Sequence, residues 1–332
     1  MQVNELFRQS NTILLDGGMG TMLQAAGLKL GARPEELNIT DPALIEGIHG
    51  QYAAAGSRIV NANTFGASAH KLAGSAYTLE QVITAGIENC KRACAPYGAL
   101  TALDVGPLGE LLEPSGTLAF EDAVAEYARI VKAGEAAGAD LIFFETYTDL
   151  YELKAALLAA KENTRLPILA SMSFEAGGRT FTGCTVESFA ATARGLGADA
   201  VGINCSLGPK EIFPMAKRLA EAVPGNFPVF VKPNAGLPRA DGSGYDITPQ
   251  LFALQMKPYR ELHLFAAGGC CGTTPEFIKL LNGTFAGCTP GRPAHRMPSV
   301  LCTPVDTVTV DGITVVGERI NPTGKKRFQQ AL

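Results

Sequence analysis

Two adjacent cysteines stand in a frame of glycines in the carboxyl-terminal third of the chain. Cys270 and Cys271 occur in the stretch GGCCG. Successive side chains of a strand point to opposite faces, so both thiols reach one point only where the backbone leaves the strand. Glycine permits that departure because it tolerates positive φ. A disulfide between neighbouring residues would be strained, and a shared metal ion is the easier explanation.

A third thiol, Cys205 in the motif GINCS, is the candidate that would complete the set. Thiolate sulfur suits zinc, which takes it at about 2.3 Å in a tetrahedral site. Structural zinc sites usually have four protein ligands, whereas three ligands leave one position open, as in catalytic zinc. The competing interpretation is that the three cysteines are small buried residues at tight turns.

The charge of such a centre indicates its chemistry. A doubly charged zinc ion with three thiolates is a poor Lewis acid for a carbonyl, but it still binds an incoming thiol and helps to remove its proton. A free thiol titrates near pH ~8.5, so little of it is thiolate at neutral pH. Coordination raises that fraction, and an anionic ligand set keeps the sulfur nucleophilic. The pattern therefore predicts alkyl transfer to a thiol.

Eight short apolar runs must position these cysteines. They are residues 12–18, 58–65, 100–107, 140–147, 167–174, 200–206, 228–236 and 261–269. Their hydrophobicity is continuous rather than alternating, which is typical of parallel strands covered on both faces. Helical stretches lie between them, at 42–56, 79–94, 120–138 and 150–163, and several start at good N-caps: Thr40 or Asp41, Thr78 and Asp149. Eight such units favour a closed (β/α)₈ TIM barrel.

In a barrel of this kind, function lies at the carboxyl ends of the strands. The polar and unusual residues of the runs stand there. They are Asp16, Gly17, Gly18, Asn63, Thr64, Asp104, Glu145, Thr146, Ser173, Asn204, Cys205, Asn234, Cys270 and Cys271. We expect Asp16 to point into the mouth from a tight strand-to-helix turn, although it and Glu145 could instead be caps or ion-pair partners. The three asparagines could instead satisfy loop backbone groups.

The last thirty residues differ from the repeating pattern. Asp311-Gly312 between β-branched runs predicts a β-hairpin. We therefore expect a barrel over residues 1–300 and a short hairpin and linker extension over 301–332. No room is expected for a second domain.

Composition excludes several classes of protein. The net charge of −4 provides no basic footprint for nucleic acid. No run approaches the ~20 apolar residues of a membrane span, and no signal peptide is evident. We expect a cytoplasmic protein. Eight cysteines in 332 residues do not indicate a disulfide framework. We expect Cys90 and Cys94 to be core thiols and Cys184, Cys288 and Cys302 to be structural or incidental. The histidines show no ligand spacing.

Five motifs together resemble the homocysteine S-methyltransferase domain family, and within it the amino-terminal module of cobalamin-dependent methionine synthases. The motifs are DGGMGT (16–21), NTFGAS (63–68), GINCSLGP (202–209), KPNAG (232–236) and GGCCGTTPE (268–276). The resemblance implies a (β/α)₈ barrel in which Cys205, Cys270 and Cys271 hold zinc and the sulfur of homocysteine is the fourth ligand. By analogy, Asp16 and Glu145 contact the ammonium group of homocysteine. Backbone amides near Gly17–Gly18 and Thr64–Ser68 are reasonable partners for its carboxylate.

The resemblance also bears on the methyl donor. Relatives that use betaine have a tyrosine directly after the glutamate and grip the quaternary ammonium with aromatic rings. Here Thr146 follows Glu145 and the chain has no tryptophan. A methylcorrinoid such as methylcobalamin, presented by another module or protein, suits the sequence better, and S-methylmethionine is an alternative. GERINPTG (317–324) resembles the opening of a pterin-binding domain.

Two further hypotheses stay open at this stage. The enzyme could act on another small thiol or a selenol. Alternatively, the chain could be a non-catalytic, zinc-bearing module that docks on a corrinoid protein.

Overall fold

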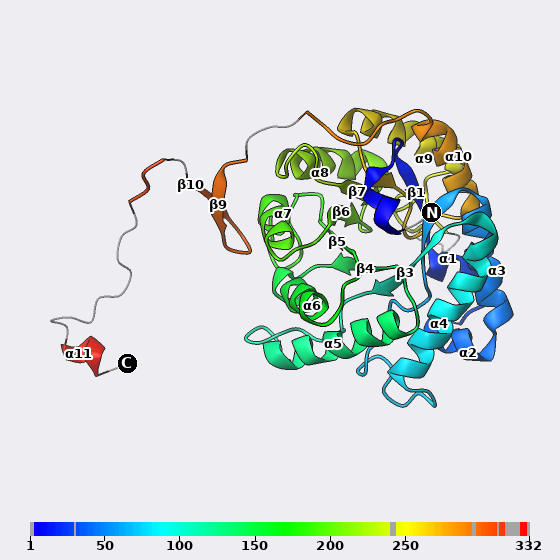
Figure 1. Cartoon of the computed structure of the whole chain (residues 1–332), viewed down its shortest axis with the longest axis horizontal. Helices are drawn as coiled ribbons and strands as arrows, with labels where there is room; N and C mark the ends of the chain where they lie inside the picture. Colours follow the sequence, from blue (N-terminus) through cyan, green and yellow to red (C-terminus); the bar gives the residue numbers. More distant parts are fainter. Residues whose placement is uncertain are drawn as a thin grey trace.

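The computed structural model describes residues 3–29, 31–239, 244–293, 297–310, 312–315 and 326–330. Within them, eight parallel strands close into a barrel in sequence order and helices surround it (Figure 1). The strands are β1 (Ile13–Leu15), β2 (Ser57–Asn61), β3 (Leu100–Val105), β4 (Leu141–Tyr147), β5 (Ile168–Met172), β6 (Ala200–Asn204), β7 (Val229–Lys232) and β8 (Ala266–Ala267). Each strand falls within one residue of a predicted run, so the (β/α)₈ barrel is confirmed.

Barrel closure depends on the pairing of the first strand with the last. Ile13 pairs with Ala266 and Leu14 with Ala267 in parallel register. β8 is only two residues long. The chain therefore leaves the barrel wall just before the two adjacent cysteines.

The outer helices begin where the sequence predicts them. α3 (Pro42–Ala54), α4 (Leu79–Cys94), α5 (Phe120–Ala136) and α6 (Leu150–Asn163) match the four predicted stretches. The other helical segments are η1 (Val3–Arg8), α1 (Met19–Ala25), η2 (Pro34–Glu36), α2 (Leu37–Thr40), η3 (Ala95–Tyr97), α7 (Val186–Gly195), α8 (Pro209–Glu221), α9 (Pro249–Met256), η4 (Lys257–Leu262), α10 (Pro275–Phe285) and α11 (Lys326–Gln329). In the described residues, no helix is long and apolar enough to cross a membrane.

Three helices start at the predicted N-caps. The Asp41 side chain accepts from the third residue of α3, and Asp149 accepts from Tyr151 N–H at 2.9 Å. Thr78 and Gln81 form a reciprocal capping box at the start of α4. Each side chain satisfies a backbone N–H that has no partner inside its helix.

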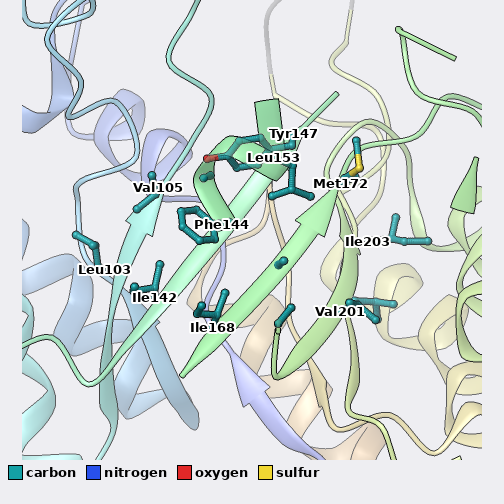
Figure 2. Packing of buried hydrophobic residues seen from close by; sticks show 14 of the residues in the cluster. Leu103, Val105, Ile142, Phe144, Tyr147, Leu153, Ile168, Met172, Val201 and Ile203 are labelled. Carbon is teal, nitrogen blue, oxygen red and sulfur yellow. The ribbon is translucent and has the colours of Figure 1, made fainter. Parts of the chain in front are cut away.

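The strands separate two apolar layers. Ile142 and Phe144 lie in the large outer cluster between strands and helices, part of which is drawn in Figure 2. Phe143 points the other way, into the barrel, where its ring centroid is 5.0 Å from that of Phe230. Leu6 of η1 is fully buried in this inner cluster. The sequence reading missed this contribution from the amino-terminal segment.

Towards the carboxyl ends of the strands the inner face becomes polar. Side chains of a strand alternate with a period of two. Glu145 therefore stands above Phe143, and Lys232 stands above Phe230, on the same inward face. In the same way, Asp104 stands two residues after the inward-facing Ala102, and Asn61 stands two residues after the inward-facing Ile59. The inward-facing side chains of the strands are therefore apolar inside the barrel and polar at the carboxyl ends of the strands.

His49 of α3 is fully buried, and neither ring nitrogen has a hydrogen-bond partner among the described residues. Burial lowers the pKa of His49 from 6.5 to about 3. The folded state therefore keeps this ring neutral while the unfolded state protonates below pH 6.5. The protonation equilibrium of His49 therefore costs no stability above pH 6.5. As the pH falls from 6.5 towards 3, protonation of the unfolded state lowers the free energy of unfolding.

We expect the folded state to lose about 2 kcal/mol between pH 6.5 and pH 5 through this residue. Urea unfolding of wild type and His49→Phe at both pH values measures the effect, and the variant should show a smaller loss. The exposed His70→Gln is the matched control and should behave as wild type. Equal pH dependence in all three proteins would contradict the assignment.

The carboxyl-terminal extension contains a hairpin upstream of the predicted Asp311-Gly312 turn. β9 (Ser299–Cys302) pairs antiparallel with β10 (Thr307–Val310) beside α7 (Figure 1). The turn of this hairpin lies at 303–306, where the Thr303 side chain accepts from Asp306 N–H at 3.1 Å. Asp311 and 317–324 lie outside the described residues. The predicted boundary at residue 300 falls inside β9.

Candidate metal centre and its cavity

A cavity of about 350 Å³ opens at the carboxyl ends of the strands. Eight of the predicted site residues line it: Asp16, Gly17, Gly18, Asn63, Glu145, Cys205, Cys270 and Cys271. Asn61, Asp104, Thr146, Lys232 and Tyr245 line it as well. The thiols and the carboxylates therefore face one common space.

The sulfur atoms of Cys205, Cys270 and Cys271 all lie within 4.8 Å of one another. The Sγ atoms of Cys205 and Cys271 are 3.7 Å apart. Tetrahedral zinc with sulfur at about 2.3 Å places its ligands roughly 3.8 Å from each other, so the three thiols fit such an ion. No other group of three metal-ligating side chains comes together in the described ranges of the chain.

Burial and mutual contact keep these thiols neutral in the absence of a metal ion. The hydrogen bond with Cys205, together with burial, raises the pKa of the Cys270 thiol well above its usual range. A thiol binds a metal ion as the thiolate, so metal binding at this cluster would release protons.

The loop after β7 joins the two cysteine loops. Cys205 N–H donates to the carbonyl of Lys232 at 3.0 Å, and Ala235 N–H donates to the carbonyl of Cys271 at 2.9 Å. The side-chain oxygen of Asn234 accepts from Cys271 N–H at 3.1 Å. Strands β6 and β8 are not neighbours, and β7 between them brings their ends together.

The backbone of the two cysteine loops adopts unusual conformations at two positions. Cys205 has φ 62 and Gly272 has φ 79, both in the left-handed region. This region is uncommon for a residue with a side chain and is associated with functional sites. A Cβ at Gly272 would lie 2.3 Å from the ring of Tyr245, so the close approach of this tyrosine also requires glycine.

Gly17 and Gly18 are required by packing against the cysteine loop. A Cβ on Gly18 would lie 2.8 Å from the carbonyl oxygen of Cys270, and one on Gly17 would lie 2.7 Å from Thr273 Oγ1. Thr273 in turn donates to the Cys270 carbonyl at 2.6 Å. Gly18 N–H donates to the carbonyl of Thr273, whereas Gly17 N–H has no acceptor among the described residues.

Lys232 is the main feature that the sequence reading missed. Its ammonium group is 3.0 Å from Asp16 Oδ1 and 3.0 Å from Glu145 Oε2, and its side chain is only 2% exposed. Burial lowers the pKa of Lys232, but Asp16 and Glu145 outweigh burial and raise it well above its usual range. The two predicted ammonium ligands thus already share a cation of the protein.

The inward position of Lys232 could have been predicted from the sequence. Lys232 is the last residue of the run PVFVK. It stands two positions after the inward-facing Phe230, so its side chain is expected to face inward as well. The Lys232 ammonium lies 5.0 Å from the centroid of the Phe143 ring, which adds a cation–π contact. A cation at an inward position of a buried strand indicates a charged partner in the barrel mouth.

Thr64 and Ser68 are buried but do not line the cavity. Thr64 Oγ1 donates to the carbonyl of Asp104 at 2.8 Å, and Ser68 Oγ donates to the carbonyl of Leu108 at 3.2 Å. Their N–H groups donate to the carbonyls of nearby loop residues. Both residues hold the loops after β2 and β3 together.

Asn204 is also buried behind the lining. Its Oδ1 accepts from Thr146 N–H at 2.9 Å, and its Nδ2 is 3.8 Å from Cys270 Sγ. Asn204 thereby supports both the left-handed turn after Glu145 and one of the thiols. The Asn63 side chain reaches the cavity but donates to the Pro34 carbonyl at 2.8 Å.

The other five cysteines lie away from this cluster. Cys90, Cys94, Cys184 and Cys288 are buried, and Cys302 is exposed. The Sγ atoms of Cys90 and Cys94 are 3.8 Å apart on α4, within the outer core. These positions agree with the predicted role of Cys90 and Cys94 as core thiols.

The fold and the site together define a (β/α)₈-barrel enzyme with a cluster of thiols at its carboxyl-terminal mouth. Residues 13–285 match the model of the homocysteine S-methyltransferase family, and the chain belongs to this family of methyltransferases.

Known proteins agree with this placement. The chain is 32% identical over 343 residues to the methionine synthase of Mycobacterium tuberculosis and 32% identical over 350 residues to that of Mycobacterium leprae. Each match covers 96% of this chain but only 28% of the relative. The metallated form of the Escherichia coli homocysteine methyltransferase MmuM shares the fold, with a TM-score of 0.73 and 24% identity. That match covers 85% of this chain and 99% of the other.

Proposed function

We propose that this chain catalyses methyl transfer to the thiol of homocysteine, giving methionine, with zinc held by Cys205, Cys270 and Cys271. The observation that carries the proposal is the pairing of two chemistries in one cavity. Three convergent thiols, which suit a metal that binds sulfur, face the same space as a set of carboxylates that suit an ammonium group. Homocysteine carries both a thiol and an ammonium group.

The chemistry that zinc supplies when bound is a lowered pKa of the substrate thiol, which makes its sulfur nucleophilic at neutral pH. The residues of the chain bind and orient the substrate. Asp16 and Glu145 present carboxylate oxygens to its ammonium group, and the unpaired N–H of Gly17 is available to its carboxylate. In the reaction the substrate thiol gives its proton to water, its sulfur forms a bond to the methyl carbon, and the bond from that carbon to the donor breaks with its electron pair left on the donor.

A methylcorrinoid held by another module or protein is the proposed donor. The cavity of about 350 Å³ accommodates an amino acid, whereas a corrinoid ring is far larger and would present its methyl group at the mouth. The methionine synthases matched here extend far beyond the region that this chain covers. Thr146, rather than an aromatic residue, follows Glu145, so the aromatic rings of the lining, Phe65 and Tyr245, stand elsewhere in the cavity.

Methionine formation from homocysteine tests the proposal. We expect the zinc-loaded chain to form methionine with free methylcobalamin, and to lose this activity when a chelator removes the metal. Turnover with S-methylmethionine instead would change the donor, and preference for another thiol or a selenol would change the acceptor. A metal-loaded chain that turns over no donor would support the non-catalytic docking module.

A further inference from the structure

Two polar side chains in the cavity lack partners. Oδ1 of Asp104 is buried and has no hydrogen-bond partner among the described residues. The amide nitrogen of Asn61 is buried and equally without an acceptor in that part of the chain. The two residues are only 7% and 6% exposed, and both line the cavity. Buried polar groups without partners are rare, and each calls for an explanation.

The two side chains are neighbours on the barrel. β2 pairs with β3 in parallel register, with Asn61 opposite Ala102. Asp104 stands two residues further along, on the same inward face as Ala102. The unsatisfied donor and the unsatisfied acceptor therefore share one side of the cavity.

The charges of the cavity are not balanced within the chain. Lys232 is shared by Asp16 and Glu145, and Asp104 has no ion pair among the described residues. A buried carboxylate without a partner is costly, so the site is built for a cation that the chain does not supply.

We infer that Asp104 and Asn61 form a subsite for the α-amino acid group of the substrate, in which Asp104 accepts from the ammonium and Asn61 Nδ2 donates to the carboxylate. This inference rests on the proposed function and adds two binding residues to it. The unpaired acceptor on Asp104 suits the ammonium of an α-amino acid, and the unpaired donor on Asn61 suits its carboxylate. The thiol cluster follows β6 and β8, on either side of β7, and β7 lies across the eight-stranded ring from β3. An elongated aminothiol acid would therefore span the cavity, with its sulfur at one side and its charged end at the other.

Binding of three thiols by the metal-containing protein tests the subsite. Isothermal titration calorimetry compares homocysteine with 4-sulfanylbutanoate, which lacks the ammonium, and with 3-aminopropane-1-thiol, which lacks the carboxylate. We expect Asp104→Asn to weaken the binding of homocysteine and of the aminothiol by about 10- to 100-fold, and to leave 4-sulfanylbutanoate unchanged. Asn61→Ala should weaken homocysteine and 4-sulfanylbutanoate by about 10-fold and spare the aminothiol.

Two controls separate binding from folding. Asp122→Asn, at an exposed site in the first turn of α5, should bind all three thiols as wild type does. Asp104→Asn should unfold at a temperature no lower than that of wild type, because asparagine keeps the size of the side chain and buries no charge. If the wild type binds homocysteine and both cavity variants bind all three thiols equally well, the subsite is wrong and the proposed function stands. If the wild type does not bind homocysteine at all, both are overturned.

Discussion

Replacement of Cys270 by serine is expected to abolish zinc binding and methyl transfer together. Cys270 is the most buried of the three thiols, and its sulfur lies next to the other two and to the Asn204 amide. Serine removes the soft thiolate and leaves two ligands, too few for a stable site. The loss should exceed the roughly 10- to 100-fold decrease in metal affinity that follows removal of an outer-shell partner.

Zinc content after dialysis, and methionine formation from homocysteine and methylcobalamin, measure the two effects on one sample. Cys302→Ser is the matched control because Cys302 is exposed and lies outside the cluster. It should keep both zinc and activity. A Cys270→Ser protein that transfers methyl groups at the wild-type rate without zinc would refute the mechanism.

Replacement of Lys232 by methionine is expected to lower the free energy of unfolding by about 3–5 kcal/mol. Methionine preserves much of the volume but removes the ammonium group that lies 3.0 Å from both Asp16 and Glu145. Two carboxylates would then remain buried without their cation. Urea unfolding at neutral pH measures the loss.

Two comparisons make this result specific. Lys279→Met on the exposed face of α10 should change the stability little. Adding Asp16→Asn to Lys232→Met should restore part of the loss, because one fewer uncompensated charge stays buried. If the Lys232→Met protein is as stable as the wild type, the ammonium is not the cation that balances these carboxylates.

The barrel could be predicted from the sequence because its determinants are local. Each strand follows from one apolar run, and Asp41, Thr78 and Asp149 cap helices through residues two or three positions away. The hairpin of β9 and β10 was missed because strand pairing is not a local property. β10 pairs with β9, which precedes it in the chain. Pairing partners, unlike turn propensity, depend on the rest of the fold.

The site was predictable to the extent that parallel strands bring their carboxyl ends together. This geometry alone brings Asp16, Glu145 and the three cysteines to one cavity. The partners of each side chain do not follow from it. Lys232 was missed because its run was treated as uniformly apolar. The left-handed backbone at Cys205 opposes the intrinsic preference of the residue, so only the surrounding contacts explain it.

The orientation of the asparagines also depends on tertiary contacts. Asn204 ends β6 and Asn234 follows β7, but their side chains support the cysteine loops instead of lining the cavity. A loop side chain at a strand end can face either way, and its nearest unsatisfied backbone group decides which.

X-ray absorption at the zinc edge, with and without homocysteine, tests the central claim most directly. We predict one zinc per chain with a shell that contains three sulfur atoms from Cys205, Cys270 and Cys271, and one additional sulfur when homocysteine is added. A reduced, folded protein that binds no zinc would contradict the account, as would a zinc shell that homocysteine does not change.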